Sequence, residues 1–162
     1  NSAVEETEVE YPIRIVRYEL RENSEGAGQF RGGLGLRRDW RFLDHACTFT
    51  IMSDFRIGRP WGLFGGEPAA SAQYVLEPDG EKTQLPSKTT LHLQPGATVG
   101  FRTPGGGGYG NPMNRDPEAV LKDVVEEKIS LRRAREAYGV VIDETTIRVD
   151  ADATERLRRG SA

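Results

Sequence analysis

The sequence predicts a mainly β fold, antiparallel and built as a sandwich or barrel, with a short α-helical tail at the C-terminus. Between residues 12 and 103, apolar side chains recur at every second position in short runs that Gly and Pro separate. After the glycine run at 105–108, the apolar spacing becomes that of helices. We therefore expect a β-rich body over residues 1–110 and a helical tail over residues 111–162, packed on the same domain.

The first three strands are expected at residues 12–21, 34–42 and 47–52, after a polar lead-in. In the first strand the apolar phase changes faces between Ile15 and Val16. This change indicates a bulge, or a strand that is buried on both faces. A glycine-rich loop separates the first strand from the second. Because only a short turn separates the second and third runs, we expect these two strands to pair as an antiparallel hairpin.

The second half of the body combines a long irregular stretch with further strands. Residues 54–70 show no periodicity and are rich in Gly and Pro, and a structureless run of this length is either functional or wrongly assigned. Further strands are expected at residues 73–77, 89–94 and 97–103. Residues 78–80 are Pro-Asp-Gly and predict a turn, because Pro presets φ and Gly accepts a positive φ.

Helices in the tail are marked by capping residues. Asp116, which a proline follows, is expected to cap the first helix. Ser130 is expected to cap a second helix, which Gly139 would end in the left-handed conformation. Asp152 and Glu155 stand at the spacing of a capping box and predict the start of a last short helix.

Composition excludes several classes of protein. The chain has 22 Lys and Arg residues against 25 Asp and Glu residues, and the net charge of −3 argues against a nucleic-acid partner. No apolar run is long enough to span a membrane, so a membrane partner is not expected either. A single cysteine, Cys47, excludes an internal disulfide and a cysteine-based zinc site.

The N-terminus is acidic and has neither a basic region nor an apolar segment, so it is not a signal peptide. We therefore expect a cytoplasmic location. Because the chain opens without Met on this acidic stretch, we also expect it to be a piece of a longer polypeptide.

No catalytic residue can be assigned from the sequence. Gly105, Gly107 and Gly110 match the dinucleotide-binding spacing G-x-G-x-x-G, but Pro112 prevents the helix that should follow. We interpret the four glycines at 105–108 as positions where backbones pack closely. The two histidines of the chain are too few for a convincing metal cluster, so no metal ligand is predicted.

Several residues are candidates for facing a substrate or a partner. They are Arg31, Asp54, Arg56, Trp61, Gly65 and Gly66. Asp54 and Arg56 follow a strand and could hold a polar ligand, and the alternative is a structural ion pair that braces the loop. Arg31 either contacts an anion or carries a solvated charge in a turn. The aromatic loop around Trp61 either covers a pocket or an interface, or folds back as a small core.

A series of short motifs runs along nearly the whole chain. The motifs are Tyr11-Pro12, Tyr18-Glu19-Leu20-Arg21, Ser24, Gly26-Ala27-Gly28, Arg31-Gly32-Gly33-Leu34-Gly35, Ser53-Asp54 with Arg56, Pro60-Trp61-Gly62-Leu63 with Gly65-Gly66, Leu85-Pro86-Ser87-Lys88, Thr103-Pro104 through Gly110, Arg115-Asp116-Pro117-Glu118-Ala119-Val120 and Tyr138-Gly139-Val140-Val141. In order and spacing they resemble the hydantoinase B/oxoprolinase family.

The resemblance covers only what looks like the C-terminal part of the family's B component. It implies a part in the ATP-dependent hydrolysis of cyclic amides such as hydantoin, 5-oxoproline or a lactam. The implied partners are the missing N-terminal part of the B component and an A-type ATP-binding subunit or domain, in an oligomer. ATP and a divalent metal are implied for the complete enzyme, with none bound by this fragment, because the family's metal ligands lie in the missing part.

Two further expectations accompany this resemblance. The fragment by itself should be inactive. The alternative role is that of a non-catalytic assembly module in a related acetone- or acetophenone-carboxylase-type complex, because some members of the family carboxylate small ketones.

The chain also departs from the family's pattern. Residues 23–26 are Asn-Ser-Glu-Gly where the family tends to have Asp-Ser-Gly-Gly, and Phe55 separates Asp54 from Arg56 where the two are often adjacent. Ala69 follows Pro68 where Gly is usual. The first two departures weaken any assignment of these positions to substrate binding in the family's usual way.

Overall fold

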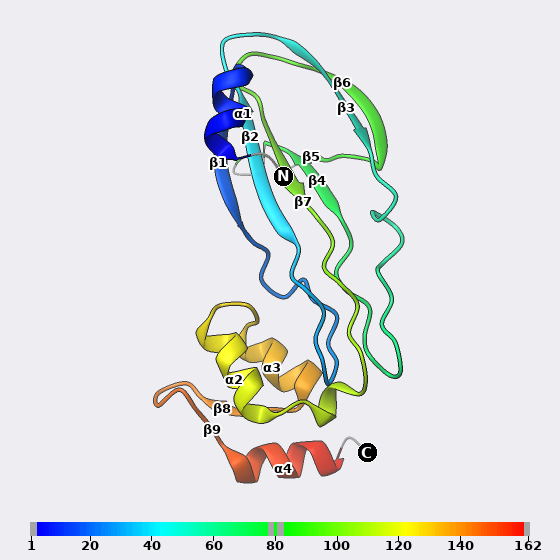
Figure 1. Cartoon of the computed structure of the whole chain (residues 1–162), viewed down its shortest axis with the longest axis vertical. Coiled ribbons are helices and arrows are strands. Elements are labelled where there is room, and N and C mark those ends of the chain that lie inside the picture. The colour runs from blue at the N-terminus through cyan, green and yellow to red at the C-terminus, as the bar shows by residue number, and fades with distance from the viewer. Residues whose placement is uncertain (1–2, 78–79, 81–82, 161–162) are drawn as a thin grey trace. The chain divides into compact units, whose positions relative to one another are not determined.

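The computed structural model describes residues 3–77, 80 and 83–160 (Figure 1). The elements are, in order, α1 (Val4–Glu10), β1 (Ile13–Leu20), β2 (Leu36–Phe42), β3 (Cys47–Met52), β4 (Gln73–Leu76), β5 (Thr83–Gln84), β6 (Lys88–Leu93), β7 (Thr98–Arg102), η1 (Pro112–Asn114), α2 (Pro117–Val125), α3 (Leu131–Tyr138), β8 (Ile142–Asp143), β9 (Arg148–Val149) and α4 (Ala151–Gly160).

The chain divides into two compact units that alternate along the sequence. The first, here called the β unit, consists of Asn1–Leu20, Leu36–Gly58 and Ser71–Thr103. The second, here called the glycine–helix unit, consists of Arg21–Gly35, Arg59–Ala70 and Pro104–Ala162. Two loops from the first 70 residues therefore group with the tail. The division into domains at residue 110 stays a prediction.

The β unit is an antiparallel sandwich, which confirms the predicted class of fold. Its larger sheet has the strand order β1-β2-β7-β4-β5, and β3 pairs with β6 in a second sheet (Figure 1). Phe49 of β3 contacts the rings of Phe42 on β2 and Phe101 on β7, with centroids 5.9 and 5.7 Å apart. These aromatic contacts join the two sheets face to face, and Ile51, Leu93 and Val99 are buried in the same core.

The predicted hairpin between residues 34–42 and 47–52 is wrong. Both edges of β2 are occupied, because β2 pairs with β1 on one side and β7 on the other. The chain crosses to the second sheet after Phe42, and β3 then pairs with β6. Packing between sheets decides this choice, and a local pattern of alternating residues carries no information about it.

Two other features of the β unit concern its first segment. The register of β1 against β2 shifts between Ile15 and Arg17, which confirms the predicted bulge. The polar lead-in forms the short helix α1, none of whose residues is buried.

The turn expected at residues 78–80 falls largely outside the described residues, although the Gly80 N–H donates to the Glu77 carbonyl.

Helices α2 and α3 of the glycine–helix unit begin where the sequence predicts. The Asp116 carboxylate accepts a hydrogen bond from the Glu118 N–H, and the Ser130 hydroxyl accepts one from the Arg133 N–H. Gly139 ends α3 at a φ of 61°. These caps confirm the predicted boundaries, and a core around Val120, Ile129 and Tyr138 lies beneath the helices.

The predicted capping residue of the last helix, Asp152, is wrong by two positions. Helix α4 begins at Ala151, and the Asp150 carboxylate accepts a hydrogen bond from the Ala153 N–H at 2.9 Å. Asp150 is therefore the capping residue, and Asp152 lies inside the first turn. Glu155 forms an ion pair with Arg159 one turn later instead of closing a capping box.

Candidate functional site

Three glycine-rich segments of the glycine–helix unit pack backbone against backbone. These segments, here called the glycine core, are residues 24–33, 60–70 and 104–110. A Cβ at Gly107 would lie 1.8 Å from the Trp61 carbonyl oxygen, and one at Gly32 would lie 1.8 Å from the Gly106 oxygen. Only residues without a side chain permit so close an approach, which is the steric reason that collagen also requires Gly at its axis.

Hydrogen bonds across the glycine core use the N–H groups that a phosphate loop would offer to its ligand. The Gly106 N–H donates to the Gly33 carbonyl, and the Gly108 N–H donates to the Glu67 carbonyl. The Gly110 N–H donates to the Leu63 carbonyl. Because these donors are occupied by the chain itself, they cannot hold a pyrophosphate, and the interpretation of the glycines as close backbone contacts is confirmed.

A buried acid, Glu25, lies within the glycine core. Its residue exposure is 1%, and its Oε1 accepts hydrogen bonds from Arg133 Nε at 3.0 Å and from the Tyr138 hydroxyl at 3.2 Å. Arg133 also reaches Glu67 Oε2 at 3.1 Å. This network anchors α3 to the glycine core. Among the described residues, Glu25 Oε2 has no hydrogen-bond partner.

The same network shifts the pKa values of its members. Burial, and then the negative charge of Glu25, raise the pKa of the Tyr138 hydroxyl above its ordinary value of 10.0. Burial acts to lower the pKa of the Arg133 guanidinium, but the hydrogen bond and the charge of Glu25 outweigh it and the pKa is raised. Tyr138 therefore remains protonated and Arg133 charged through the physiological range.

A second buried acid, Asp123 on α2, binds two arginines. Asp123 Oδ2 accepts from Arg31 Nε and from Arg115 Nη2, both at 2.8 Å. Burial acts to lower the pKa of Arg31, and the hydrogen bond and charge of Asp123 reverse this effect, so that the pKa is raised. Arg31 also donates to the Gly32 carbonyl at 3.0 Å. This predicted site residue thus has structural partners, and a contact to substrate stays a prediction for it.

The other candidate residues divide between the two units. Asp54 is exposed and Arg56 half-buried in the turn after β3, in the β unit. No ion pair joins them in the described part of the chain, and Arg56 Nε has no hydrogen-bond partner there. Trp61 and Gly65 are exposed in the glycine–helix unit, whereas Gly66 lies in the glycine core. The structure therefore groups Arg31, Trp61, Gly65 and Gly66 in one unit, apart from the Asp54–Arg56 turn.

The aromatic loop around Trp61 is highly exposed, which argues against the alternative that it folds back as a small core. Trp61 is 74% exposed and Phe64 is 78% exposed. The Phe64 ring instead lies 5.1 Å from the ring of Tyr109, which comes from the third glycine segment. Sequence reasoning missed this neighbour, because the two residues lie in glycine segments far apart in the sequence and no local pattern connects them.

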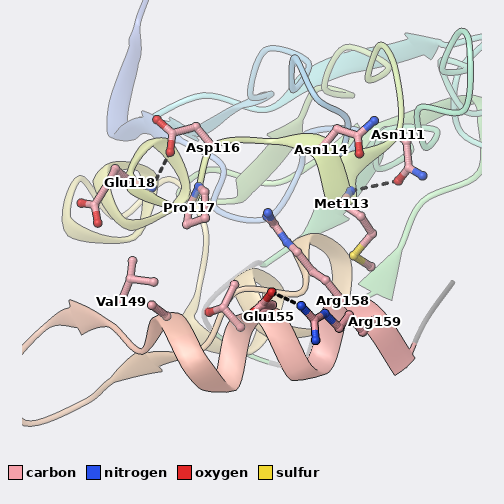
Figure 2. A pocket seen from close by; sticks show the side chains of 12 residues that line it. Asn111, Met113, Asn114, Asp116, Pro117, Glu118, Val149, Glu155, Arg158 and Arg159 are labelled. Atoms are coloured by element: carbon pink, nitrogen blue, oxygen red, sulfur yellow. Dashed lines mark hydrogen bonds and ion pairs between the residues drawn. The ribbon is translucent and has the colours of Figure 1, made fainter.

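A cavity of about 780 Å³ lies beside α4 in the glycine–helix unit (Figure 2). Glu155 and Arg159 form an ion pair on its α4 side, and Asp116 and Glu118 line it from the start of α2 (Figure 2). Arg158 donates to the carbonyls of Tyr138 and Arg115, and burial lowers the pKa of its guanidinium. Arg158 therefore has a structural function, and the cavity is lined by charged residues of both signs.

The described residues offer no constellation for catalysis by a bound metal ion. Among residues 3–77, 80 and 83–160, no group of three or more His, Cys, Asp or Glu side chains could hold a metal ion. Within the same part of the chain, no helix has the length and apolarity needed to cross a bilayer. That the fragment binds no cofactor stays a prediction.

Comparison with known proteins identifies related sequences. The family model described as hydantoinase B/oxoprolinase matches residues 1–112. The chain is 44% identical to the uncharacterized protein MJ0963 of Methanocaldococcus jannaschii, over 98% of this chain and 28% of that protein. It is 37% identical to the B-type subunit of a putative D-/L-hydantoinase of Pseudomonas sp., over 98% of this chain and 27% of that protein. The chain thus spans about a quarter of the length of these relatives.

The fold recurs in solved structures of known proteins. The ATP-dependent caprolactamase of Pseudomonas jessenii superposes with a TM-score of 0.88 at 33% identity, over 98% of this chain and 28% of that chain. The match includes residues of both units, because it leaves out only a small part of the chain. The strands, glycine segments and helices described above therefore recur within a longer polypeptide.

Proposed function

The chain belongs to the hydantoinase B/oxoprolinase family, and from this membership we propose that it is the C-terminal domain of a B-type subunit. The subunit takes part in ATP-dependent hydrolysis of a cyclic amide, such as hydantoin, 5-oxoproline or a lactam. The observation that carries the proposal is the match of 98% of this chain to the B-type subunit of a putative D-/L-hydantoinase. The 33% identity with an ATP-dependent caprolactamase supports the same substrate class.

The contribution of this chain is structural support for the reacting part of the enzyme. Opening a cyclic amide requires an activated carbonyl and a delivered water. We propose that other parts of the complete enzyme hold ATP and the metal. This is in keeping with the lack of a group of three or more possible metal ligands among the described residues, and with the hydrogen bonds that the N–H groups of Gly106, Gly108 and Gly110 already make. An A-type subunit or domain would bind ATP. We also propose a hetero-oligomeric, cytoplasmic enzyme.

The direct test uses the full-length subunit together with its A-type partner. Purified complex is incubated with ATP, Mg²⁺ and, in turn, hydantoin, 5-oxoproline and caprolactam, and the ring-opened product and ADP are measured. We expect formation of both products with one of these compounds. Absence of hydrolysis with all three, together with ATP-dependent fixation of bicarbonate onto a small ketone, would contradict the proposal.

Within this enzyme, the six candidate residues are proposed to face the substrate or partner. Arg56 is the candidate with the most direct test, because its Nε is buried and has no hydrogen-bond partner among the described residues. Arg56→Ala in the full complex should raise KM at least about tenfold, as expected when a charged hydrogen bond to substrate is lost. Arg14→Ala, at an exposed position of β1, is the control. Unchanged KM and kcat in Arg56→Ala would remove Arg56 from the site.

A second function, assembly without a direct part in the chemistry, is favoured by the exposure of Trp61. Large exposed aromatics are frequent anchors of protein interfaces. Trp61→Ala should then reduce the size of the complex in light scattering, while the complex that remains assembled keeps its turnover. Loss of turnover in fully assembled complex would instead place Trp61 near the reaction. Under this alternative, the chain would be a non-catalytic assembly module of a related acetone- or acetophenone-carboxylase-type complex.

A further inference from the structure

Four large side chains form a continuous exposed cluster on the glycine core. This aromatic cluster consists of Phe30, Leu63, Phe64 and Tyr109, with exposures of 62, 52, 78 and 48%. The Tyr109 ring lies 6.3 Å from the ring of Phe30 and 5.1 Å from that of Phe64. Leu63 and Phe30 are both bridged to Tyr109 through their backbones. Each of the three glycine segments thus contributes to one apolar surface.

The backbone holds this cluster in a fixed position. The Leu63 N–H donates to the Gly108 carbonyl, and the Leu63 carbonyl accepts from the N–H groups of Gly66 and Gly110. Phe30 and Tyr109 exchange two backbone hydrogen bonds of 2.9 and 3.0 Å. A backbone that is already fixed loses less conformational entropy when a partner binds, so a cluster carried on such a backbone is suited to docking.

Strain at the tip of the cluster supports a function for it. Phe64 adopts a φ of 51°, in the left-handed region that is unfavourable for a bulky L-residue. The strained residue is also the most exposed of the four, so burial within the described chain does not compensate for the strain. Isolated exposed apolar residues, such as Val125 on α2, are ordinary by comparison.

We propose that the aromatic cluster is the docking surface for the part of the same subunit that lies outside these 162 residues. This inference rests on the proposed function, under which the chain is about a quarter of a longer polypeptide, as the 28% and 27% coverages of its relatives indicate. A covalently attached partner is present at a high effective concentration and therefore competes favourably with separate molecules for an apolar surface. The cluster is then buried in the core of an interface between domains of one chain.

Hydroxyl-radical footprinting of the full-length subunit tests this proposal without any substitution. The subunit is oxidised without its A-type partner, at a dilution where size-exclusion chromatography shows a monomer, and oxidation of each residue is measured by mass spectrometry. We expect Phe30, Phe64 and Tyr109 to be protected about tenfold relative to the unfolded subunit, as is typical of interface cores that exclude water. Val125 provides the internal reference.

Other outcomes overturn the proposal and identify another occupant. Oxidation of the cluster at the rate of the unfolded subunit means that nothing in the monomer covers it. Protection that appears only when the A-type partner is added assigns the surface to that partner, and protection that is lost on dilution of a dimer assigns it to a second copy. Because footprinting requires no turnover, a subunit that hydrolyses no cyclic amide can still show the protection.

A substitution gives a second, independent measurement on the same full-length subunit. Phe64→Ser should raise the oxidation of Phe30 and Tyr109 severalfold, because a polar residue within the apolar surface loosens the shared interface. Val125→Ser, at a similarly exposed position of the same unit, should leave both rates unchanged. Equal effects of the two substitutions, or no effect of Phe64→Ser, would contradict docking at this surface.

Discussion

At the scale of single residues, Glu25 shows how an acid within a glycine-rich segment becomes a tertiary anchor. Burial of a charge is costly unless it is paired and hydrogen-bonded. Arg133 and Tyr138 supply that pairing from positions 108 and 113 residues away. The sequence shows an acid in a glycine run, but nothing in it indicates partners at such a separation, so Glu25 could not be predicted as a buried anchor.

The pairing of Glu25 with Arg133 can be tested by removing one member. Arg133→Met should lower the free energy of unfolding by about 3 kcal/mol, because Glu25 remains buried without its cation. The double substitution Glu25→Met with Arg133→Met should recover most of this loss. Arg132→Met, at an exposed position of the same helix, is the matched control. Urea denaturation compares these variants with the wild type, and equal losses at positions 132 and 133 would contradict the buried pair.

The raised pKa of Tyr138 makes the free energy of unfolding depend on pH in the alkaline range. Its folded-state pKa is raised by burial and by Glu25, so above pH 10.0 the unfolded chain loses the phenol proton while the folded chain keeps it. The stability that protonated Tyr138 contributes is therefore complete below about pH 10 and declines above it. The difference in unfolding free energy between the wild type and Tyr138→Phe should shrink from about pH 10 upward. A difference that stays constant from about two pH units below this point to one unit above it, measured by urea denaturation, would show that the pKa is not raised.

At the scale of elements, the sequence predicts local events well and long-range pairing poorly. The bulge after Ile15, the cap at Ser130 and the left-handed end at Gly139 are decided by neighbouring residues, and all three are confirmed. The pairing of β2 with β7 depends on contacts across the fold, and the predicted hairpin with β3 is wrong. The cap of α4 was missed because Asp150 and Asp152 are both good capping residues, and only the observed hydrogen bond distinguishes them.

The glycine core provides a matched pair of substitutions. At Gly107 a Cβ would lie 1.8 Å from the Trp61 carbonyl oxygen, and the neighbouring backbone leaves no room to adjust. At Gly33 nothing lies within 4 Å of a Cβ. Gly107→Ala should therefore lower the free energy of unfolding by at least about 3 kcal/mol, while Gly33→Ala should change it by less than about 1 kcal/mol. Thermal unfolding measures both, and similar Tm values for the two variants would contradict the close packing.

At the scale of the whole molecule, composition and periodicity were sufficient for the fold class but not for the grouping of segments. Alternation between residues 12 and 103 predicts the antiparallel sandwich that the β unit shows. The loops at 21–35 and 59–70 group with the tail, because backbone hydrogen bonds join them to residues 104–110. The candidate residues were also predicted only in part. Trp61 is exposed as an interface residue would be, but the sequence did not indicate Phe30 and Tyr109 of the aromatic cluster.

The expected inactivity of this piece by itself is a prediction for the whole molecule. The 162-residue chain, supplied with ATP, Mg²⁺ and an A-type partner, should release no ring-opened product from hydantoin, 5-oxoproline or caprolactam. The physical reason is that its described residues include no group of acids, histidines or cysteines able to hold a metal ion. The full-length subunit under the same conditions is the positive control. Measurable hydrolysis by the 162-residue chain would show that the reactive groups lie within it.

The alternation of the two units along the chain has a consequence for biosynthesis. Gly26 is hydrogen-bonded to Gly106, and the Phe30 backbone to that of Tyr109, so the earliest glycine segment has no complete set of partners until the latest one has left the ribosome. Strands β1 to β7 are all translated before that moment. A nascent chain that stalls before residue 104 would thus carry two glycine loops that lack their partners from residues 104–110, as accessible targets for proteases and chaperones.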